Sequence, residues 1–305
     1  MERVLITGGA GYVGCVLVPL LLENGYHVTV LDRFLHRSPG LITCVNHPNF
    51  IPIKGDSRDV DTIRSALKNI DWVIPLAAIV GAPACELNHG EASSVNVDAI
   101  KLICQESKWR PLIFPMTNSG YGKGKVDENS PLNPLSHYGL TKVRAEREVL
   151  ERGDSVSLRF ATAFGPSPRM RTDLLVNDFV LRAVRDHSAI LYESHFRRNF
   201  IHVYDMARSF LFVMKHWGTL KHKVYNVGLP NSWSKKELCE SIQRVLPGFQ
   251  FLEAVVGSDP DQRDYEVSVE RFSAEGFFCV KPLQDGIQEL IKVYTMFPGS
   301  EFTNV

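Results

Sequence analysis

Short apolar runs alternate with longer segments of helical periodicity through the first half of the chain. Apolar runs bounded by turn residues predict six strands, at residues 3–7, 27–31, 50–54, 71–76, 111–116 and 155–160. Between them, apolar positions three and four residues apart predict helices at 12–24, 60–69, 92–107 and 137–152. Strands that alternate with helices form right-handed βαβ units, so the pattern predicts an α/β fold with a doubly wound parallel sheet.

The regular alternation ends near residue 165. Beyond it, helices are predicted at 174–186, 205–217, 235–246 and 283–297, interrupted by glycine, proline and arginine. No linker or low-complexity tract separates the two parts. We therefore predict a large sheet domain over residues 1–165, to which a segment at about 199–228 returns, and a smaller α/β lobe over mainly 166–305.

Composition narrows the class of protein. The 305 residues are 44% hydrophobic and 22% charged, as in an ordinary soluble globular chain. Lysine plus arginine and aspartate plus glutamate each number 34. A net charge of zero argues against a broad field that would attract nucleic acid or an anionic membrane. No stretch approaches the roughly 18 apolar residues of a membrane span.

The six cysteines are far apart and form no CxxC pair, and the ten histidines form no close ligand pair. A disulfide framework and a zinc site both need such spacings, so neither is expected. A reduced, cytoplasmic compartment fits best. We expect the protein to bind no metal, no nucleic acid and no membrane.

A glycine-rich loop, GGAGYVG, joins the first strand to the first helix. Its glycines Gly8, Gly11 and Gly14 permit a tight turn, close approach of backbone N–H groups to a pyrophosphate, and packing of the helix on the strand. The anion then lies at the helix N-terminus. Asp32 ends the second strand about 20 residues downstream, where a carboxylate can bind a ribose hydroxyl. Together these features predict a Rossmann fold that binds NAD.

The residues near Asp32 leave open whether the cofactor is NAD or NADP, and whether Asp56 contacts it. Asp32 repels a 2′-phosphate and favours NAD, whereas the adjacent Arg33 is able to receive that phosphate, so NADP stays open. Asp56 follows the third predicted strand and is placed to meet the adenine edge of the cofactor. An ordinary solvated loop carboxylate is nearly as good an interpretation of Asp56.

Tyr138 and Lys142 are four residues apart in SHYGLTK, so on a helix they share one face. A tyrosine that acts as a base near pH 7 must have its ionisation favoured by about 4 kcal/mol, and a neighbouring ammonium supplies part of this. Tyr121 and Lys125 have the same spacing, but three glycines in that segment disfavour a helix. The alternative for the first pair is a surface helix with a solvated lysine.

Thr117 follows the fifth predicted strand in the run FPMTNSGYG. Ligands bind at the carboxyl ends of the strands in such sheets. A threonine hydroxyl at that edge can bind a substrate oxygen and pass on a proton. A structural cap is an equally good interpretation of Thr117 taken alone.

Taken together, these motifs resemble the extended short-chain dehydrogenase/reductase family of nucleotide-sugar enzymes. The resemblance is carried by GGAGYVG, Asp32, Gly55 with Asp56, LAA at 76–78, VNV at 95–97, TNSGYG and YGLTK, and it continues through RFATAFGP (159–166) and RNFIHVYDMA (198–207). It implies that the domain over 1–165 binds NAD and that the lobe over 166–305 binds the nucleotide-sugar. It also implies that Thr117, Tyr138 and Lys142 are catalytic, and that the enzyme is a homodimer.

The resemblance further implies two sets of binding residues. The expected cofactor-binding residues are Gly8, Gly11, Tyr12, Val13, Asp32, Arg33, Asp56, Ser57, Leu76, Ala77, Ala78, Asn96, Tyr138, Lys142 and Phe164. The expected substrate-binding residues are Val80, Thr117, Asn118, Ser119, Asn177, Arg169, Arg198 and Arg263. Asn96 would support the lysine through water. The arginines would bind the diphosphate of the nucleotide-sugar, because guanidinium groups suit phosphate oxygens, and a solvated surface position is the alternative for each.

Two positions narrow the reaction. Sugar dehydratases of this family carry Asp and Glu directly after the catalytic threonine, because eliminating water needs a second acid and base. This chain has Asn118 and Ser119 there, so no carboxylate is offered for proton transfer at carbon 5. The remaining reaction is hydride transfer at a single carbon. By analogy with the family, this is carbon 4 of the sugar.

A finer resemblance concerns the substrate. The runs LAAIVGAP (76–83), LLVNDF (174–179), HFRRNFIHV (195–203) and DPDQRDYEVS (259–268) look closest to the GDP-heptose 4-dehydrogenases and 4-epimerase-like enzymes of surface-polysaccharide biosynthesis. The first functional hypothesis is therefore a GDP-heptose 4-dehydrogenase. The alternatives are a 4-epimerase of a UDP- or GDP-linked hexose, with no net redox change, and a catalytically silent NAD-binding regulator.

Overall fold

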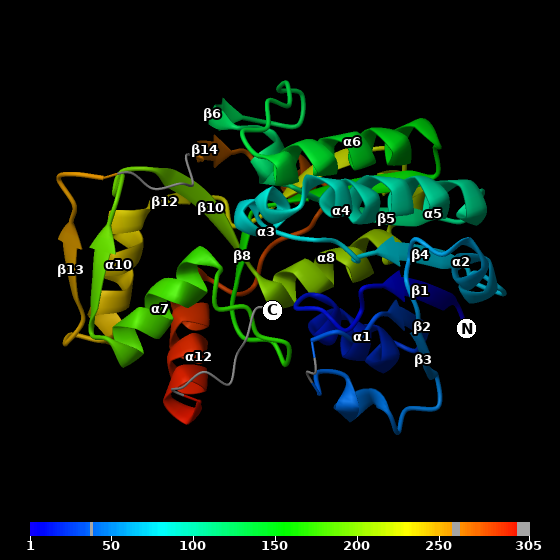
Figure 1. Ribbon diagram of the computed structural model, residues 1–305, viewed down its shortest axis with the longest axis horizontal. Helices are drawn as coiled ribbons and strands as arrows, with labels where there is room; N and C mark the ends of the chain where they lie inside the picture. Colours follow the sequence, from blue (N-terminus) through cyan, green and yellow to red (C-terminus); the bar gives the residue numbers. More distant parts are fainter. Residues whose placement is uncertain (37–38, 258–262, 298–305) are drawn as a thin grey trace.

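A computed structural model describes residues 1–36, 39–257 and 263–297 (Figure 1). At its centre is a 7-stranded sheet in the order β11-β7-β5-β4-β1-β2-β3. Every neighbouring pair is parallel, so the carboxyl ends of all strands lie at one edge. The strands are β1 (Arg3–Thr7), β2 (His27–Asp32), β3 (Phe50–Lys54), β4 (Trp72–Pro75), β5 (Leu112–Thr117), β7 (Ser155–Phe160) and β11 (Val224–Val227). The predicted doubly wound α/β fold is confirmed.

Helices cover both faces of this sheet because the side chains of each strand alternate between them. In β1, Val4 and Ile6 pack on one face with α1 and α8, whereas Leu5 packs on the other with α2, α5 and α6. These helices are α1 (Gly14–Glu23), α8 (Val203–Lys215), α2 (Val60–Ala66), α5 (Ala99–Ser107) and α6 (His137–Glu151). The helix predicted at 205–217 thus belongs to the large sheet, as does β11, which was not predicted.

The remaining short helical segments lie in the loops. They are η1 (Ile42–Cys44), α3 (Ala82–Leu87), α4 (His89–Ser93), the π-helical turn η2 (Ser94–Asp98), the 3₁₀ turn η3 (Asn118–Gly120), α9 (Trp217–Leu220) and α11 (Glu270–Ala274). The predicted helix at 92–107 is therefore three segments, α4, η2 and α5, rather than one.

A second hydrophobic core lies among the helices at the left of Figure 1. Its buried side chains include Phe164, Phe179, Phe200, Leu238 and Leu290. The helices are α7 (Leu175–Arg185), α10 (Lys235–Val245) and α12 (Leu283–Met296). Three small sheets complete the fold: β8 (Thr162–Phe164) with β10 (Arg197–His202) and β12 (Ser232–Ser234), β9 (Ser188–Leu191) with β13 (Gln250–Glu253), and β6 (Lys123–Val126) with β14 (Asp264–Val267).

Parts of two predictions lie outside the described residues. The run at 259–268 begins with residues 259–262, and the predicted second lobe ends with residues 298–305. The division into domains at residue 165 stays a prediction. Within the described ranges, no helix combines the length and apolar character needed to cross a bilayer. The same ranges contain no cluster of three or more His, Cys, Asp or Glu side chains suited to a metal ion.

Candidate active site

The glycine loop brings the end of β1 against the end of β4. Gly8 has a φ of +71°, and a Cβ on it would lie 2.4 Å from the backbone nitrogen of Ala77. A Cβ on Gly14, the first residue of α1, would lie 2.2 Å from the carbonyl oxygen of Gly9. Only glycine therefore permits this approach of loop, strand end and helix start. Gly8, Ala10 and Gly11 of the loop remain part-buried rather than fully buried.

Replacing Gly8 with alanine tests this approach, and Gly25→Ala is the matched control. Gly25 also has a positive φ, of +84°, but a Cβ there would meet nothing within 4 Å. Gly25→Ala is expected to cost about 1–2 kcal/mol of unfolding free energy through backbone strain alone. Gly8→Ala should cost more and should also weaken NAD binding. Denaturant unfolding and calorimetric titration measure both, and equal losses in the two variants would contradict the packing argument.

The loop and Asp32 fit a dinucleotide. One carboxylate oxygen of Asp32 accepts a hydrogen bond from the N–H of Ala10 at 3.0 Å, and the other accepts from the N–H of Phe34 at 2.8 Å. These bonds fix the carboxylate at the end of β2, where it can still accept from a ribose diol. The N–H groups of Tyr12 and Val13 have no backbone partner among the described residues. Helix N-termini of this kind bind phosphate.

Arg33 lies among carboxylates. It is 3.7 Å from Asp56 and 3.9 Å from Glu91. Asp56 accepts hydrogen bonds from the guanidinium of Arg58, which holds the pKa of its carboxyl below the usual value. A 2′-phosphate near Arg33 would meet Asp32, Asp56 and Glu91, so the arrangement favours NAD over NADP.

Several other residues expected at the cofactor are held by protein contacts. The Tyr12 hydroxyl donates to the carbonyl of Gly165 at 2.6 Å. The Phe164 ring is fully buried against Phe200 and His202, so only its backbone remains for a nicotinamide. Ser57 is buried, and the other expected residues that follow β3 and β4 or begin α1 are part-buried: Asp56, Leu76, Ala77, Ala78 and Val13.

Tyr138 and Lys142 lie on one face of α6. The helix begins after Ser136, whose hydroxyl accepts a hydrogen bond from the N–H of Gly139 at 3.2 Å. A Cβ on Gly139 would lie 3.0 Å from the carbonyl oxygen of Ser119, so the glycine lets the start of α6 approach the end of β5. This approach brings Tyr138 within hydrogen-bonding reach of Thr117.

The second Tyr–Lys pair has a different environment. Tyr121 is buried and donates a hydrogen bond to Asn226 at 2.8 Å. Lys125 lies on β6, and its side chain is 86% exposed. The two residues are not on a helix, as the glycines between them predict.

Lys142 is a buried cation. Its ammonium lies 4.2 Å from the centroid of the Phe114 ring, and the residue is 5% exposed. Burial lowers the pKa of Lys142 to about 7, and Glu146 one turn further along α6 opposes this shift.

The pKa of Lys142 makes stability depend on pH. Folded Lys142 releases its proton near pH 7, whereas an unfolded lysine keeps it to about pH 10.4. The unfolded state therefore binds more protons between these values, and this residue's contribution to stability rises with pH there. Below about pH 7 the folded state bears the full free-energy cost of burying the charged lysine. Lys142→Met is expected to be more stable than the wild type near pH 7, and the difference should shrink toward pH 10.

Denaturant unfolding of both proteins at several pH values measures this difference. The control is Lys101→Met on the adjacent helix α5, whose exposed ammonium pairs with Glu148 and should give no such trend. A difference between wild type and Lys142→Met that is constant with pH would show that the lysine is not perturbed.

The electrostatics of Tyr138 depend on two arginines. Burial raises the pKa of Tyr138 to about 12, and the positive charges of Arg171 and Arg263, with a hydrogen bond from Thr117, oppose this shift. The expected partner Lys142 is not among the groups that lower this pKa. Arg171 stands out in the sequence as one of the arginines suited to a diphosphate, but it is 33 residues from Tyr138, so no local spacing indicates this contact.

A chain of hydroxyl groups joins Tyr138 to Arg263. Thr117 Oγ1 and Ser119 Oγ are 3.1 Å apart, and Arg263 donates to Ser119 Oγ at 2.6 Å. Thr117 also lies close enough to Tyr138 to lower the pKa of its phenol, so polar groups gather at the end of β5. The carboxyl edge of the sheet thus presents hydroxyl and guanidinium groups to a ligand.

Asn96 acts through a wider network than expected. Its amide accepts from the N–H of Ile79 at 2.8 Å and donates to the carbonyl of Ile79 at 2.9 Å. It also lies 3.1 Å from the hydroxyl of Thr141, the residue before Lys142. Asn96 sits in the π-helical turn η2, which aims its side chain at both elements. It therefore ties the loop after β4 to α6.

The residues expected at the substrate lie in contrasting environments. Asn118 is fully buried, and neither amide atom has a hydrogen-bond partner within the described chain. Asn177 is also fully buried, but its amide accepts from the N–H of Gly165 and donates to the carbonyl of Arg171, which holds the loop between β8 and α7. Val80 is part-buried after β4, and Arg198 is buried on β10. Their roles toward substrate remain predictions.

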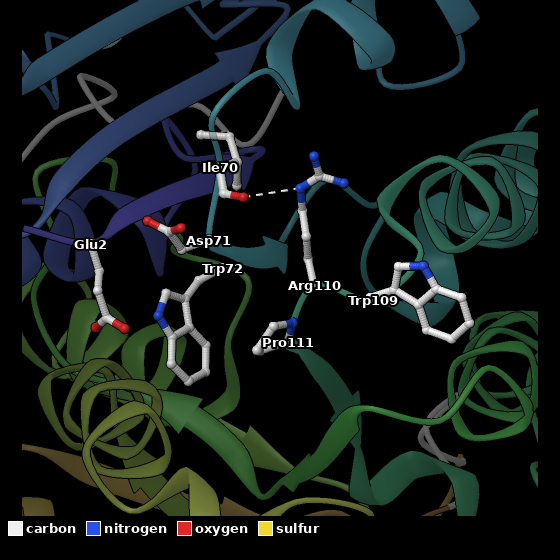
Figure 2. A pocket seen from close by; sticks show the side chains of 7 residues that line it. All are labelled: Glu2, Ile70, Asp71, Trp72, Trp109, Arg110 and Pro111. Atoms are coloured by element: carbon white, nitrogen blue, oxygen red, sulfur yellow. Dashed lines mark hydrogen bonds between the residues drawn. The ribbon is translucent and has the colours of Figure 1, made fainter.

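A surface hollow lies at the opposite edge of the sheet. Figure 2 shows its lining, where Arg110 donates to the carbonyl of Ile70 at 2.9 Å. Glu2, Asp71 and Pro111 directly precede β1, β4 and β5, so this hollow lies at the amino ends of the strands. Ligands of such sheets bind at the carboxyl ends, where Thr117 and the glycine loop lie. The hollow is therefore separate from the candidate active site.

Comparison with known proteins agrees with this geometry. Residues 4–228 match the model of the NAD dependent epimerase/dehydratase family, which is most of the chain. The chain belongs to this family. It is therefore an NAD-dependent enzyme of the extended short-chain dehydrogenase/reductase type, and a catalytically silent regulator is not supported.

Individual relatives cover nearly the whole chain. A putative UDP-glucose 4-epimerase of Methanocaldococcus jannaschii is 27% identical over 309 aligned positions, which cover 94% of this chain and 97% of the relative. An uncharacterized UDP-glucose epimerase of Bacillus subtilis is 29% identical over 231 positions, 70% of this chain and 72% of the relative. The crystal structure of a UDP-glucuronic acid 4-epimerase from Bacillus cereus, in complex with UDP-glucuronic acid and NAD, has a TM-score of 0.86 at 22% identity and covers 97% of this chain and 99% of that one. The epimerase/dehydratase fold is thus shared along its length.

Proposed function

We propose that this family member is an NAD-dependent 4-epimerase that acts on a UDP-linked hexose. The observation that carries the proposal is the set of groups at the end of β5. Tyr138 and Thr117 offer one proton-transfer site, whereas Asn118 and Ser119 offer no second acid and base. The relatives named as UDP-sugar epimerases favour this function over the GDP-heptose 4-dehydrogenase expected first.

The groups on the chain account for a reversible reaction at carbon 4. Bound NAD supplies a hydride acceptor that later returns the hydride to the sugar. The Tyr138 hydroxyl, as a phenolate, takes the proton of the 4-hydroxyl and gives it back in the return step. Thr117 holds the same oxygen, and Arg171 and Arg263 stabilise the phenolate. The net redox change would be zero because the hydride, like the proton, would be returned to the same sugar.

A second candidate is hydride transfer from a GDP-linked heptose with release of the 4-keto sugar. It is supported by the resemblance of the runs at 76–83, 174–179 and 195–203. Incubation with UDP-glucose, UDP-galactose, UDP-glucuronic acid and a GDP-heptose distinguishes the two. A 4-epimer without accumulated NADH supports the first proposal. A 4-keto sugar with an equal amount of NADH supports the second, and no turnover of any of them contradicts both.

We further infer a cytoplasmic homodimer that supplies nucleotide-sugars for polysaccharide biosynthesis. All six cysteines are unpaired, which suits a reducing compartment. Helices α5 and α6 pack side by side on one face of the sheet and are the face that the family resemblance indicates for the dimer. Light scattering after gel filtration tests the oligomeric state, and a mass equal to one chain would overturn the inferred dimer.

A further inference from the structure

Arg169 is a buried arginine whose charge the protein itself does not balance. The residue is 7% exposed, and its Nη1 donates to the carbonyl of Met170. Its Nε is buried and has no hydrogen-bond partner among the described residues. The nearby carboxylate of Asp173 is instead engaged by both Nε and Nη2 of Arg171. A guanidinium that is shielded from water and bound to no carboxylate is costly unless an anion completes its environment.

The backbone around Arg169 lies across the phosphate-binding loop. The Cys15 thiol, in the first turn of α1, accepts a hydrogen bond from the backbone N–H of Arg169 and lies 3.4 Å from the carbonyl of Ala10. Ser167 donates to the carbonyl of Tyr12 at 2.7 Å. The hydrogen bond from Tyr12 to Gly165 adds a third connection. Residues 165–169, which follow β8, are therefore fastened to the loop that begins α1.

The helix start beneath this segment is itself incomplete. Helix α1 has ten residues, its N-cap Val13 makes no side-chain cap, and its first turn has no acidic residue. The N–H groups of Tyr12 and Val13 lack backbone acceptors within the described chain. A helix start with free donors and a buried guanidinium beside it both require a ligand with negative charge.

Arg169 and Arg171 have different partners. The charges of both arginines act on His36, which follows β2, and that of Arg169 has the larger effect. The Arg171 guanidinium instead lies 3.8 Å from the position of a Cβ on Gly81 and acts on Tyr138. Arg171 is therefore paired with Asp173 and lies near Tyr138, whereas Arg169 lies beside the start of α1 and has no carboxylate partner among the described residues.

We propose that Arg169 binds the diphosphate of NAD at the N-terminus of α1, so that the cofactor is held by both the glycine loop and the segment after β8. This differs from the sequence expectation, which gave Arg169 to the diphosphate of the nucleotide-sugar. It rests on the family's use of NAD and is independent of which sugar is epimerised. Because the ligand chemistry is the same for both diphosphates, the test compares the two sources.

The test is calorimetric titration of Arg169→Gln, Arg169→Lys and the wild type with NAD, with ADP, with adenosine and with UDP. Loss of one charged contact is expected to raise the Kd of Arg169→Gln for NAD and ADP by about 10- to 100-fold. The affinity of Arg169→Gln for UDP, and for adenosine, which has no phosphate, should stay within about twofold of the wild-type value. The control is Arg182→Gln, whose exposed guanidinium pairs with Asp178 on α7. All its affinities should also stay within about twofold of the wild type. A weakened Kd for UDP with unchanged NAD binding would overturn the proposal, as would no change in either.

Thermal unfolding separates this role from a purely structural one. If the unbalanced charge awaits a ligand, ligand-free Arg169→Gln should be at least as stable as the wild type, while the stabilisation by saturating NAD should be smaller. A structural arginine would instead lower the ligand-free unfolding temperature and leave the stabilisation by NAD unchanged. If Arg169→Gln does not fold, Arg169→Lys takes its place, because it keeps the charge but loses the planar guanidinium. Its Kd for NAD should rise by less than that expected for Arg169→Gln. An unchanged Kd for NAD in Arg169→Lys would overturn the proposal. None of these readouts requires turnover, so they are independent of the proposed epimerase activity.

Discussion

Tyr138→Phe is expected to lower kcat by about 10²- to 10⁴-fold, the range by which a positioned acid or base accelerates proton transfer. The substitution removes one oxygen and leaves the ring on α6. The loss is measured as the rate of epimer formation from whichever of the candidate UDP-sugars the wild type converts. NAD affinity, measured by calorimetry, should change far less than kcat.

The matched control is Tyr26→Phe, which removes the same atom from a part-buried tyrosine after α1, away from the ends of β4 and β5. It should retain wild-type kcat. The wild-type kcat/KM should also rise as the pH is raised, because burial keeps Tyr138 protonated in the free enzyme at neutral pH. Tyr138→Phe with undiminished turnover would remove the phenol from the mechanism.

Glu146→Ala is expected to cost about 3–5 kcal/mol of unfolding free energy, as when one partner of a buried ion pair is removed. Glu146 lies one turn beyond Lys142 on α6 and is 2% exposed. It accepts two hydrogen bonds from Arg159, at 2.9 and 2.8 Å, and one from Ser157 at 2.6 Å. Arg159 also donates to the Tyr121 hydroxyl at 2.8 Å. Without Glu146, a guanidinium stays buried in β7 with no carboxylate.

An exposed pair on the same helix provides the control for Glu146. Glu151 accepts from Arg147 at 2.8 Å, with side chains 60% and 80% exposed. Glu151→Ala should cost no more than about 0.5 kcal/mol, because solvent screens such pairs. Chemical denaturation of the two variants at neutral pH gives the comparison. Similar small losses in both would mean that the buried pair contributes no more than a surface one.

The large sheet could be predicted because its strands are apolar runs of ordinary length. Strands β1, β3 and β7 have the predicted bounds, β2 is one residue longer at its end, and β4 and β5 differ from the predicted bounds by one residue at both ends. The small sheets were missed because their strands are three to six residues long and carry exposed or polar side chains, as in Lys123–Val126. Their pairing is set by tertiary contacts rather than by a local period.

In the candidate active site, too, only features with a local sequence pattern could be predicted. The glycine loop, Tyr138 and Lys142 are recognisable because each depends on spacing within one element. The π-helical turn at Asn96 depends on its bonds to Ile79, and the influence of Arg171 on Tyr138 depends on how the segment after β8 folds back. Neither contact is indicated by a regular spacing of residues in the sequence. Arginines in that segment therefore indicated an anion but not which of two diphosphates it belongs to.

The late position of β11 and α8 in the chain matters during synthesis. A nascent polypeptide that has left the ribosome only as far as residue 165 lacks both elements, although β7 and α1 are complete. The edge of β7 is then unpaired, and the apolar face later covered by Phe210 and Val213 of α8 is open to water. Translation must proceed past residue 227 before this half can close. Until then the growing polypeptide is prone to aggregate, and so is a fragment that ends at residue 165.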